Sequence, residues 1–520
     1  MVKIFLDGRP VEVVEGTTVF KAAQRAGIAI PHFCYHPAFV PEGSCRLCLV
    51  EIEGSPKLEL SCSMVVREGM KVSTQSPVVQ EARRAVLEFI LAEHPLDCPI
   101  CDKAGECKLQ DYYQDHGLTE SVFRESKEKR EKKVRIGDQL ILDRERCVLC
   151  TRCVRFLAEI TKTHELGLFE RGIHSEIGGY ENEPVRNGYS GNLVDLCPVG
   201  AISDTEFRFK TRPWFLTKGE SICPLCSRGC NIFIDCHPGF PRVPGSARVY
   251  WIRPRTNEAV NGPWICDHGR YGYVDLQQKN RCQKLIWNKG PESSAELSWD
   301  KALIVIGEKI KGLRENGKTG RISLILTTCL TNEELFLIKK IFKDGLGVRN
   351  VSFADPAPGT EDGFLLRADR TPNRRGAREM GFEVTPADLD VLSRNSDILF
   401  IFSSSLAEGS NDGEWKAALE KVSVKILVTS HLNEIASAAD FVLPAATVAE
   451  KSGTLTNEDG RIQRIAAIAR ACGDIRPEVQ ILLDLAREIH LDDAYFGALT
   501  GPEEVHRELA KDIPFFGARS

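Results

Sequence analysis

The sequence lacks any apolar run long enough to cross a membrane. Its longest apolar stretches, such as Ile322–Leu326 and Ile398–Phe402, have only the length of a strand. It also lacks an excess of charge, since 68 basic and 73 acidic residues leave a net charge of -5. We therefore expect neither a nucleic-acid partner nor a polybasic membrane patch. Val2–Leu6 has a strand pattern without the features of a signal peptide, so we expect a cytoplasmic protein that reaches a membrane only through partners.

Cysteine is nearly absent from the second half of the chain. Sixteen of the nineteen cysteines precede residue 267, and only Cys282, Cys329 and Cys472 follow. In a chain of 520 residues that is expected to be cytosolic, thiols stay reduced, so metal binding is a better interpretation than disulfides. The sequence predicts metal sites in the first half and none in the second.

Local patterns predict several domains rather than one core. Val2–Val14 alternates around Asp7-Gly8, which indicates a hairpin, and Thr17 or Thr18 can then cap a helix that Gly27 stops. Apolar residues at helical spacing predict a helix from Val78 to Ala92, and the mixed-charge stretch Phe123–Arg135 is interpreted as a solvated connector.

Strand and helix patterns alternate in the second half of the chain. A strand at Ile322–Thr327 leads to a capping box at Thr331 and a helix that ends near Gly345. A strand at Ile398–Phe402, a helix around Glu414–Lys421 and a further strand then follow. This order predicts an α/β domain with a parallel sheet.

The cysteines and one histidine form four sets of candidate metal ligands. The first is Cys34, Cys45, Cys48 and Cys62; the second is His94, Cys98, Cys101 and Cys107; the third is Cys147, Cys150, Cys153 and Cys197; the fourth is Cys223, Cys226, Cys230 and Cys266.

The sets differ in how specific their spacing is. Four thiolates in the first set suit a 2Fe-2S cluster, with structural zinc as the alternative. One histidine with three cysteines in the second set suits either zinc or a four-iron cluster, and its chemistry alone leaves both open. The triplet at Cys147, completed by Cys197-Pro198, is typical of a 4Fe-4S cluster. In the fourth set Cys236 competes with Cys266, but it lies in an alternating strand pattern, so Cys266 is preferred.

The four sets in this order resemble the large iron-sulfur subunit (the G subunit) of NADH-quinone oxidoreductase, respiratory complex I. The resemblance implies one 2Fe-2S cluster on the first set and one 4Fe-4S cluster on each of the others, the second set with its histidine included. The first three clusters would carry electrons from a flavin towards quinone, whereas the fourth would lie off that path. The chain itself would have no bond-making site, and it lacks the Gly-x-Gly-x-x-Gly of an NADH site.

The same resemblance implies the partners and the location. The partners would be a flavin and NADH-binding subunit, a small 2Fe-2S subunit, a two-cluster 4Fe-4S ferredoxin-like subunit and the peripheral subunits of the quinone site. The chain would lie on the cytoplasmic side of the bacterial inner membrane, in a complex that translocates protons. An electron-wiring subunit of a soluble NAD-linked hydrogenase or formate dehydrogenase is the alternative, and a zinc-stapled scaffold is a third.

The segment from Gly219 onward also looks like the molybdopterin oxidoreductases. The resemblance rests on Thr331–Glu334, Ala439–Pro444, Glu450–Thr454 and Asn457–Arg461. This α/β part is short for an active member, and Cys329 is its only candidate ligand, interpreted as a core or switch-point thiol. We therefore expect neither molybdenum nor flavin, and the Thr454–Gly460 loop is interpreted as a structural turn.

The resemblance implies five domains. They are a β-grasp 2Fe-2S domain at residues 1–78, a small helical His/Cys3 cluster domain at 79–118, a 4Fe-4S ferredoxin-like domain at 138–215, a 4Fe-4S domain of molybdopterin-oxidoreductase type at 219–275, and a shortened molybdopterin-oxidoreductase-like α/β domain at 276–520.

Overall fold

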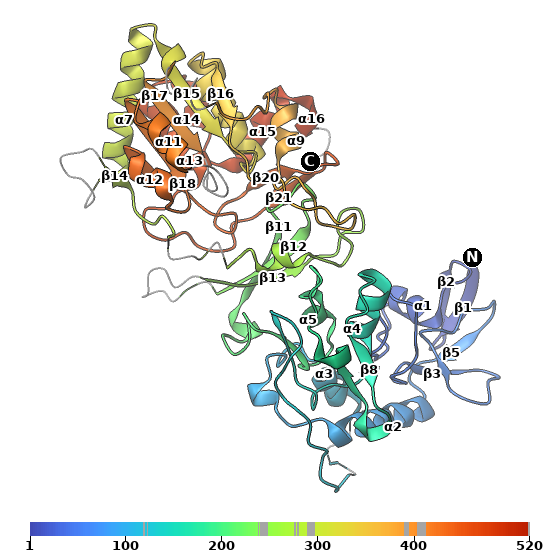
Figure 1. The fold of residues 1–520 in the computed structure, drawn as a ribbon. Helices are drawn as coiled ribbons and strands as arrows, with labels where there is room; N and C mark the ends of the chain where they lie inside the picture. Colours follow the sequence, from blue (N-terminus) through green and yellow to red (C-terminus); the bar gives the residue numbers. More distant parts are fainter. Residues whose placement is uncertain are drawn as a thin grey trace. The chain divides into compact units, whose positions relative to one another are not determined.

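The computed structural model describes residues 1–117, 120–121, 123–237, 239, 248–274, 277, 280–288, 297–388, 395–402 and 412–517. The chain divides into two compact units, Met1–Phe215 and Leu216–Ser520, which are described separately below (Figure 1). The domain limits expected at residues 118, 275 and 276 lie outside the described residues. None of the described helices is both long and apolar enough to span a membrane.

The first unit begins with a small mixed sheet and one helix. Its strands are β1 (Val2–Leu6), β2 (Arg9–Val13), β3 (Leu49–Ile52), β4 (Glu59–Leu60) and β5 (Lys71–Ser73), in the order β2-β1-β5-β3-β4. The predicted hairpin is confirmed, because β1 and β2 pair in antiparallel register and Asp7 and Gly8 both have positive φ. Helix α1 (Val19–Arg25) is capped by the Thr18 side chain, and Gly27 ends it in the left-handed conformation.

Helices and short strands make up the rest of the first unit. Helix α2 (Pro77–Glu93) agrees with the predicted helix, and α3 (Lys108–His116) follows it. The sheet β10-β7-β6 joins Ile202–Asp204, Leu140–Leu142 and Val134–Arg135. Helices α4 (Arg152–Arg155) and α5 (Asn192–Leu196) and the pair β8 (Gly167–Phe169) and β9 (Glu176–Gly178) complete this unit.

The mixed-charge stretch is exposed, but it also makes specific contacts. Lys127 Nζ donates to the Leu91 and Ala92 carbonyls at the end of α2. Lys132 Nζ lies 2.7 Å from Asp97 Oδ2 and 2.8 Å from a carboxylate oxygen of Glu145. The stretch is therefore fastened to the first unit rather than being only a solvated connector.

The second unit begins with three antiparallel strands, β11 (Thr217–Ile222), β12 (Asn231–His237) and β13 (Arg248–Pro254), and helix α6 (Asp267–Tyr271). A six-stranded sheet follows in the order β14-β19-β18-β17-β15-β16. Its strands are β14 (Ile286–Trp287), β15 (Ile322–Leu326), β16 (Asn350–Phe353), β17 (Ile398–Phe402), β18 (Val424–Thr429) and β19 (Phe441–Pro444). The predicted parallel sheet is confirmed for all of its strands except β14, which pairs antiparallel to β19.

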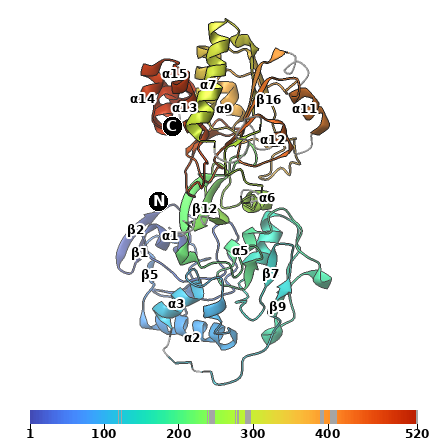
Figure 2. The ribbon, with the colours of Figure 1, turned by 90° about the vertical axis from the view of Figure 1, so that its left-hand side faces the viewer.

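Helices cover both faces of the six-stranded sheet because its strands are apolar on both sides. Leu324 packs in one core with α7 (Trp299–Glu315), α8 (Asn332–Ile338) and α13 (Glu478–Glu488), whereas Ile325 packs in another with α11 (Asp412–Leu419) and α12 (Glu434–Ala438). Figure 2 shows α7 and α13 on one side of the sheet and α11 and α12 on the other. The predicted capping box of α8 is confirmed, and a π-helical stretch continues that helix to Gly345. The remaining elements are α9 (Arg374–Glu379), β20 (Gly453–Thr456), β21 (Ile462–Ile465), α14 (Asp493–Ala498), α15 (Pro502–Asp512) and α16 (Pro514–Gly517).

Candidate functional site: four cysteine-rich metal centres

The first set gathers in the loops around β3 and β4 in the first unit. The Sγ atoms of Cys34 and Cys45 lie 3.4 Å apart, far longer than a disulfide bond, and all four cysteines are free. Hydrogen bonding between thiols lowers the pKa of Cys34 to about 5 and, through Cys62, that of Cys48 to about 7. The same hydrogen bonds raise the pKa of their partners Cys45 and Cys62, so in each pair one thiol gives up its proton more readily than the other.

The second set lies between α2 and α3, and each of its residues sits at a helix end. His94 is the C-cap of α2, Cys98 and Cys101 begin and end a short 3-10 helix, and Cys107 is the N-cap of α3. Burial raises the pKa of Cys101 and Cys107, and the charge of Cys98 raises both pKa values further.

His94 is suited to be a neutral ligand. Its Nδ1 is buried and has no hydrogen-bond partner among the described residues. Burial lowers the pKa of His94 to about 4, and the positive charges of Lys127 and Arg146 add to this effect. A neutral imidazole is the form that binds a metal. Arg146 also acts on Cys101, so one guanidinium lies near both residues.

The third set surrounds a small cavity. All four of its cysteines line this cavity, together with Leu142, Ile177, Pro198 and other mostly apolar residues. Leu149 and Thr151, which lie on either side of Cys150, have positive φ values of 50° and 58°. Such backbone is rare for residues other than glycine, and it marks the strained turn that brings the triplet round the cavity.

A glycine brings the second and third sets into contact. Gly200 follows Cys197 by three residues, and a Cβ atom built on it would lie 2.1 Å from Cys101 Sγ and 3.3 Å from Lys103 Cβ. Nearby, the Lys108 N–H donates to the Pro198 carbonyl at 3.0 Å. The turn after Cys197 therefore packs directly against the second set.

The fourth set lies at one end of the β11-β12-β13 sheet in the second unit. The Cys223 N–H donates to the Cys230 carbonyl at 2.8 Å, and Cys266 Sγ accepts from the Gly269 N–H at 3.3 Å. Burial raises the pKa of Cys223, and the charges of Cys230, Cys226 and Cys266 raise it further. The structure therefore groups Cys266 with the first three cysteines.

Cys236, the competing candidate, lies elsewhere. It is fully buried on β12, and its Sγ donates to the His237 carbonyl at 3.2 Å. Burial raises its pKa to about 11, and the negative charge of Glu450 adds to this rise. Its position is that of a buried strand residue.

These donor sets are chemically suited to iron-sulfur clusters. Main-chain N–H groups already donate to sulfur atoms in three sets: Phe33 to Cys45 at 3.4 Å, Leu149 to Cys147 at 3.4 Å, and Gly269 to Cys266 at 3.3 Å. Such bonds stabilise coordinated thiolates. Among the described residues, no group of three or more His, Cys, Asp and Glu side chains is placed so that it could hold a single metal ion.

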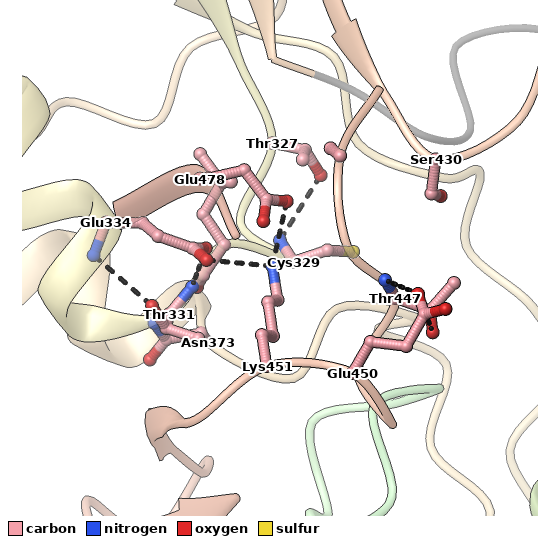
Figure 3. A network of polar contacts seen from close by, with 12 residues as sticks. Thr327, Cys329, Thr331, Glu334, Asn373, Ser430, Thr447, Glu450, Lys451 and Glu478 are labelled. Atoms are coloured by element: carbon pink, nitrogen blue, oxygen red, sulfur yellow. Dashed lines mark hydrogen bonds and ion pairs between the residues drawn. The ribbon is translucent and has the colours of Figure 1, made fainter. Parts of the chain in front are cut away.

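The carboxyl ends of the six-stranded sheet hold a buried polar network instead of a cysteine set (Figure 3). Strand β15 pairs with both β16 and β17, so Cys329, three residues after its end, lies at a switch point, where ligands often bind in α/β sheets. Lys451 Nζ lies 2.8 Å from Glu334 Oε1 and 2.9 Å from Glu478 Oε1, and all three side chains are at least 90% buried. The network joins α8 and α13 to the segment before β20.

The pH dependence of stability tests this network. Burial, followed by the charge of Glu334, raises the pKa of Glu478 from 4.5 to about 7. Because its pKa is raised on folding, Glu478 binds its proton more tightly in the folded state than in the unfolded state. The stability that this binding contributes is fully present below about pH 4.5 and is lost as pH rises through about 7. Hydrogen exchange of β15 and α13 in the full chain is expected to show a loss on the order of 2–4 kcal/mol from pH 5 to pH 8.5. Glu478→Gln is expected to flatten this slope, and an equally steep slope in that variant would contradict the assignment.

Known proteins resemble this chain over four ranges. Family models match residues 1–77 as a 2Fe-2S iron-sulfur cluster binding domain and residues 83–121 as the NADH-ubiquinone oxidoreductase-G iron-sulfur binding region. They match residues 137–203 as the ferredoxin-like domain of NADH-quinone oxidoreductase subunit 3, and residues 369–488 as a molybdopterin oxidoreductase. The first three sets fall within these ranges and the fourth does not.

Several similar proteins are named as subunits of an NADH-quinone or NADH-ubiquinone oxidoreductase. The NADH-quinone oxidoreductase G subunit of Streptomyces coelicolor is 37% identical over 71% of this chain and 42% of its own length. The Rickettsia bellii protein of the same name is 40% identical over 67% of the chain and 49% of its own length. The NADH-ubiquinone oxidoreductase 75 kDa subunit of Reclinomonas americana is 40% identical over 71% of the chain and 52% of its own length.

A solved structure is also similar in sequence. One chain of an NAD+-reducing [NiFe]-hydrogenase, in its H2-reduced state, is 33% identical, with 41% of this chain and 91% of that chain covered and a TM-score of 0.36. This chain spans about half the length of the curated relatives that it matches. It is a multidomain α/β protein with a 2Fe-2S domain, two further iron-sulfur regions and a molybdopterin-oxidoreductase domain, and it belongs to the family of the NADH-quinone oxidoreductase G subunits.

Proposed function

We propose that this chain is the electron-transfer iron-sulfur subunit of an NADH-quinone oxidoreductase, relaying electrons from an NADH-reduced flavin subunit towards quinone. The observation that carries this proposal is the packing of three ligand sets in one compact unit, with the turn after Cys197 against Cys101. A relay requires neighbouring centres to lie close together. The family assignment supports the same role.

The proposal assigns a ligand role to each set. Cys34, Cys45, Cys48 and Cys62 would hold a 2Fe-2S cluster, and each of the other three sets would hold a 4Fe-4S cluster, with His94 as the one imidazole ligand. When bound, these clusters supply one-electron oxidation and reduction. The protein's own part is to hold the sulfur ligands, to keep water out by burial and to donate main-chain N–H groups to sulfur.

The proposal extends to partners and location. Hydride chemistry would belong to a flavin and NADH-binding subunit. A small 2Fe-2S subunit, a two-cluster ferredoxin-like subunit and the peripheral quinone-site subunits would complete the path. The chain would then be peripheral on the cytoplasmic face of the membrane, in a complex that couples electron transfer to proton translocation.

One experiment tests this function against its alternatives. The protein is purified anaerobically together with the proteins that bind it. Its iron and acid-labile sulfide are measured, and low-temperature EPR spectra are recorded after stepwise reduction. Three or more reducible clusters in a quinone-reducing membrane complex are expected. Fewer than three would contradict the relay, zinc without sulfide would favour a scaffold, and copurification with soluble hydrogenase or formate dehydrogenase activity would favour the wiring alternative.

The ligand assignment of the fourth set has its own test. Cys266→Ala is expected to remove one 4Fe-4S cluster from the iron and sulfide content and from the EPR spectrum, because it deletes one of the four thiolates that would hold this cluster. Cys236→Ala changes a buried thiol of the same unit and serves as the matched control, with all clusters retained. The reverse result, with the cluster lost only in Cys236→Ala, would exchange the two assignments.

A further inference from the structure

Arg152, at the start of α4, joins the first set to the third. Its Nη2 donates to the Tyr35 carbonyl at 2.6 Å, and its Nη1 donates to the Leu196 carbonyl at 3.3 Å. Tyr35 directly follows Cys34, and Leu196 directly precedes Cys197. One guanidinium therefore connects the main chain beside a ligand of each set.

Arg155, one turn further along, fastens the same loop. Its two Nη atoms donate to the carbonyls of Cys34 and Val40, the latter at 3.0 Å. Its guanidinium carbon lies 5.2 Å from the centre of the Phe39 ring, and its Nε lies 3.5 Å from Glu42 Oε2. The two arginines together hold the loop from Cys34 to Glu42 against the helix that carries Cys153.

The two arginines differ in how their charge is balanced. Arg155 has a carboxylate neighbour in Glu42, whereas Arg152 forms no ion pair with any carboxylate among the described residues and donates hydrogen bonds to main-chain carbonyls. The Nε atoms of both arginines are buried without a hydrogen-bond partner in the part of the chain that the structure describes. Arg152 as a whole is partly buried, and an anionic group nearby would stabilise its charge.

The ligand sulfur atoms are the nearby groups that can carry negative charge. Arg155 donates to the Cys34 carbonyl, and Arg152 donates to the carbonyls directly beside Cys34 and Cys197. Clusters held by these two sets would bring negatively charged sulfur atoms close to the two guanidinium groups.

We propose that Arg152, supported by Arg155, is a shared positive charge for the clusters of the first and third sets, fixing the two sites together and raising the reduction potential of both. This inference rests on the proposed function, since it assumes that both sets hold clusters. Reduction adds one negative charge to a cluster, and a nearby cation in a poorly hydrated site stabilises that charge. Arg152 is thereby a positioning and tuning residue for electron transfer rather than a ligand.

The test is an EPR-monitored redox titration of the full chain with its clusters. Arg152→Gln keeps hydrogen-bond donors but removes the charge, so the reduced-to-oxidised ratio of both clusters at a fixed poise is expected to fall about tenfold, which corresponds to about 59 mV for a one-electron couple. Arg152→Lys keeps the charge and loses only the planar fork, so both potentials are expected to stay near those of the unchanged protein. Arg135→Gln is the matched control, since that side chain is exposed and donates to the Asp138 carbonyl.

The outcomes separate this inference from the proposed function. An unchanged protein that lacks either cluster would overturn the proposed function itself. Clusters present with unaltered potentials in Arg152→Gln, or equal shifts in the Gln and Lys variants, would overturn only the role of the charge. If Arg152→Gln fails to assemble, Arg155→Gln is titrated instead, with a fall in both potentials expected and unchanged potentials contradicting the proposal.

Discussion

Gly200→Ala is expected to abolish the cluster of the second set, although Gly200 is not a ligand. A methyl group there would lie 2.1 Å from Cys101 Sγ, closer than real Cβ contacts allow, and Lys103 Cβ at 3.3 Å blocks the other side. To remove this clash, either Cys101 or the turn after Cys197 would have to move. Cys101 is itself a candidate ligand, and the turn directly follows one. Overpacking a well-packed core usually costs about 1–3 kcal/mol, but a displaced ligand costs the cluster itself.

The measurement is iron and sulfide content together with low-temperature EPR of the reduced full chain. The EPR signal of the second set is expected to be absent, whereas the EPR signal of the first set is expected to remain. Gly188→Ala is the matched control, because Gly188 belongs to the same unit and a methyl group there meets nothing within 4 Å. If Gly200→Ala retains every cluster with an unaltered spectrum, the close packing of the second and third sets is wrong.

The local features of the fold could be predicted because their causes are close together in sequence. The hairpin at Asp7-Gly8, the Thr18 cap and the Thr331 capping box each depend on residues within a few positions, and all three occur in the structure. The parallel sheet followed from alternating strand and helix patterns. The antiparallel strand β14 was missed because it has only two residues, too few to form a pattern.

The residues of each candidate centre could be proposed from the sequence, whereas the contacts between the centres could not. The candidate ligand sets are predictions from the cysteine spacing, since metal coordination favours particular residue types at characteristic intervals. Nothing in the sequence relates Gly200 to Cys101, or Arg152 to Tyr35, because these pairs meet only after the chain has folded. The positive φ of Leu149 and Thr151 was likewise hidden, since neither residue type favours it.

Lys451→Met is expected to destabilise the second unit by about 3–5 kcal/mol, because it leaves Glu334 and Glu478 buried together without their cation. The loss would appear as faster hydrogen exchange in β15 and α13 of the full chain. Lys311→Met is the matched control: Lys311 pairs with Glu488 at 3.1 Å in the same unit but is 26% exposed, so its removal is expected to cost at most about 1 kcal/mol. Equal losses in the two variants would contradict the special role of the buried network.

The same substitution has a distinctive pH dependence. Without Lys451, Glu478 gains more from protonation, so the deficit of Lys451→Met is expected to shrink as pH falls from 8 to 5. Adding Glu334→Gln and Glu478→Gln to Lys451→Met removes the buried charges and is expected to recover much of the stability, as replacing a whole buried ion network often does. A deficit that neither low pH nor the added substitutions reduce would mean that the packing of the Lys451 stem, not its charge, stabilises the junction of α8 and α13.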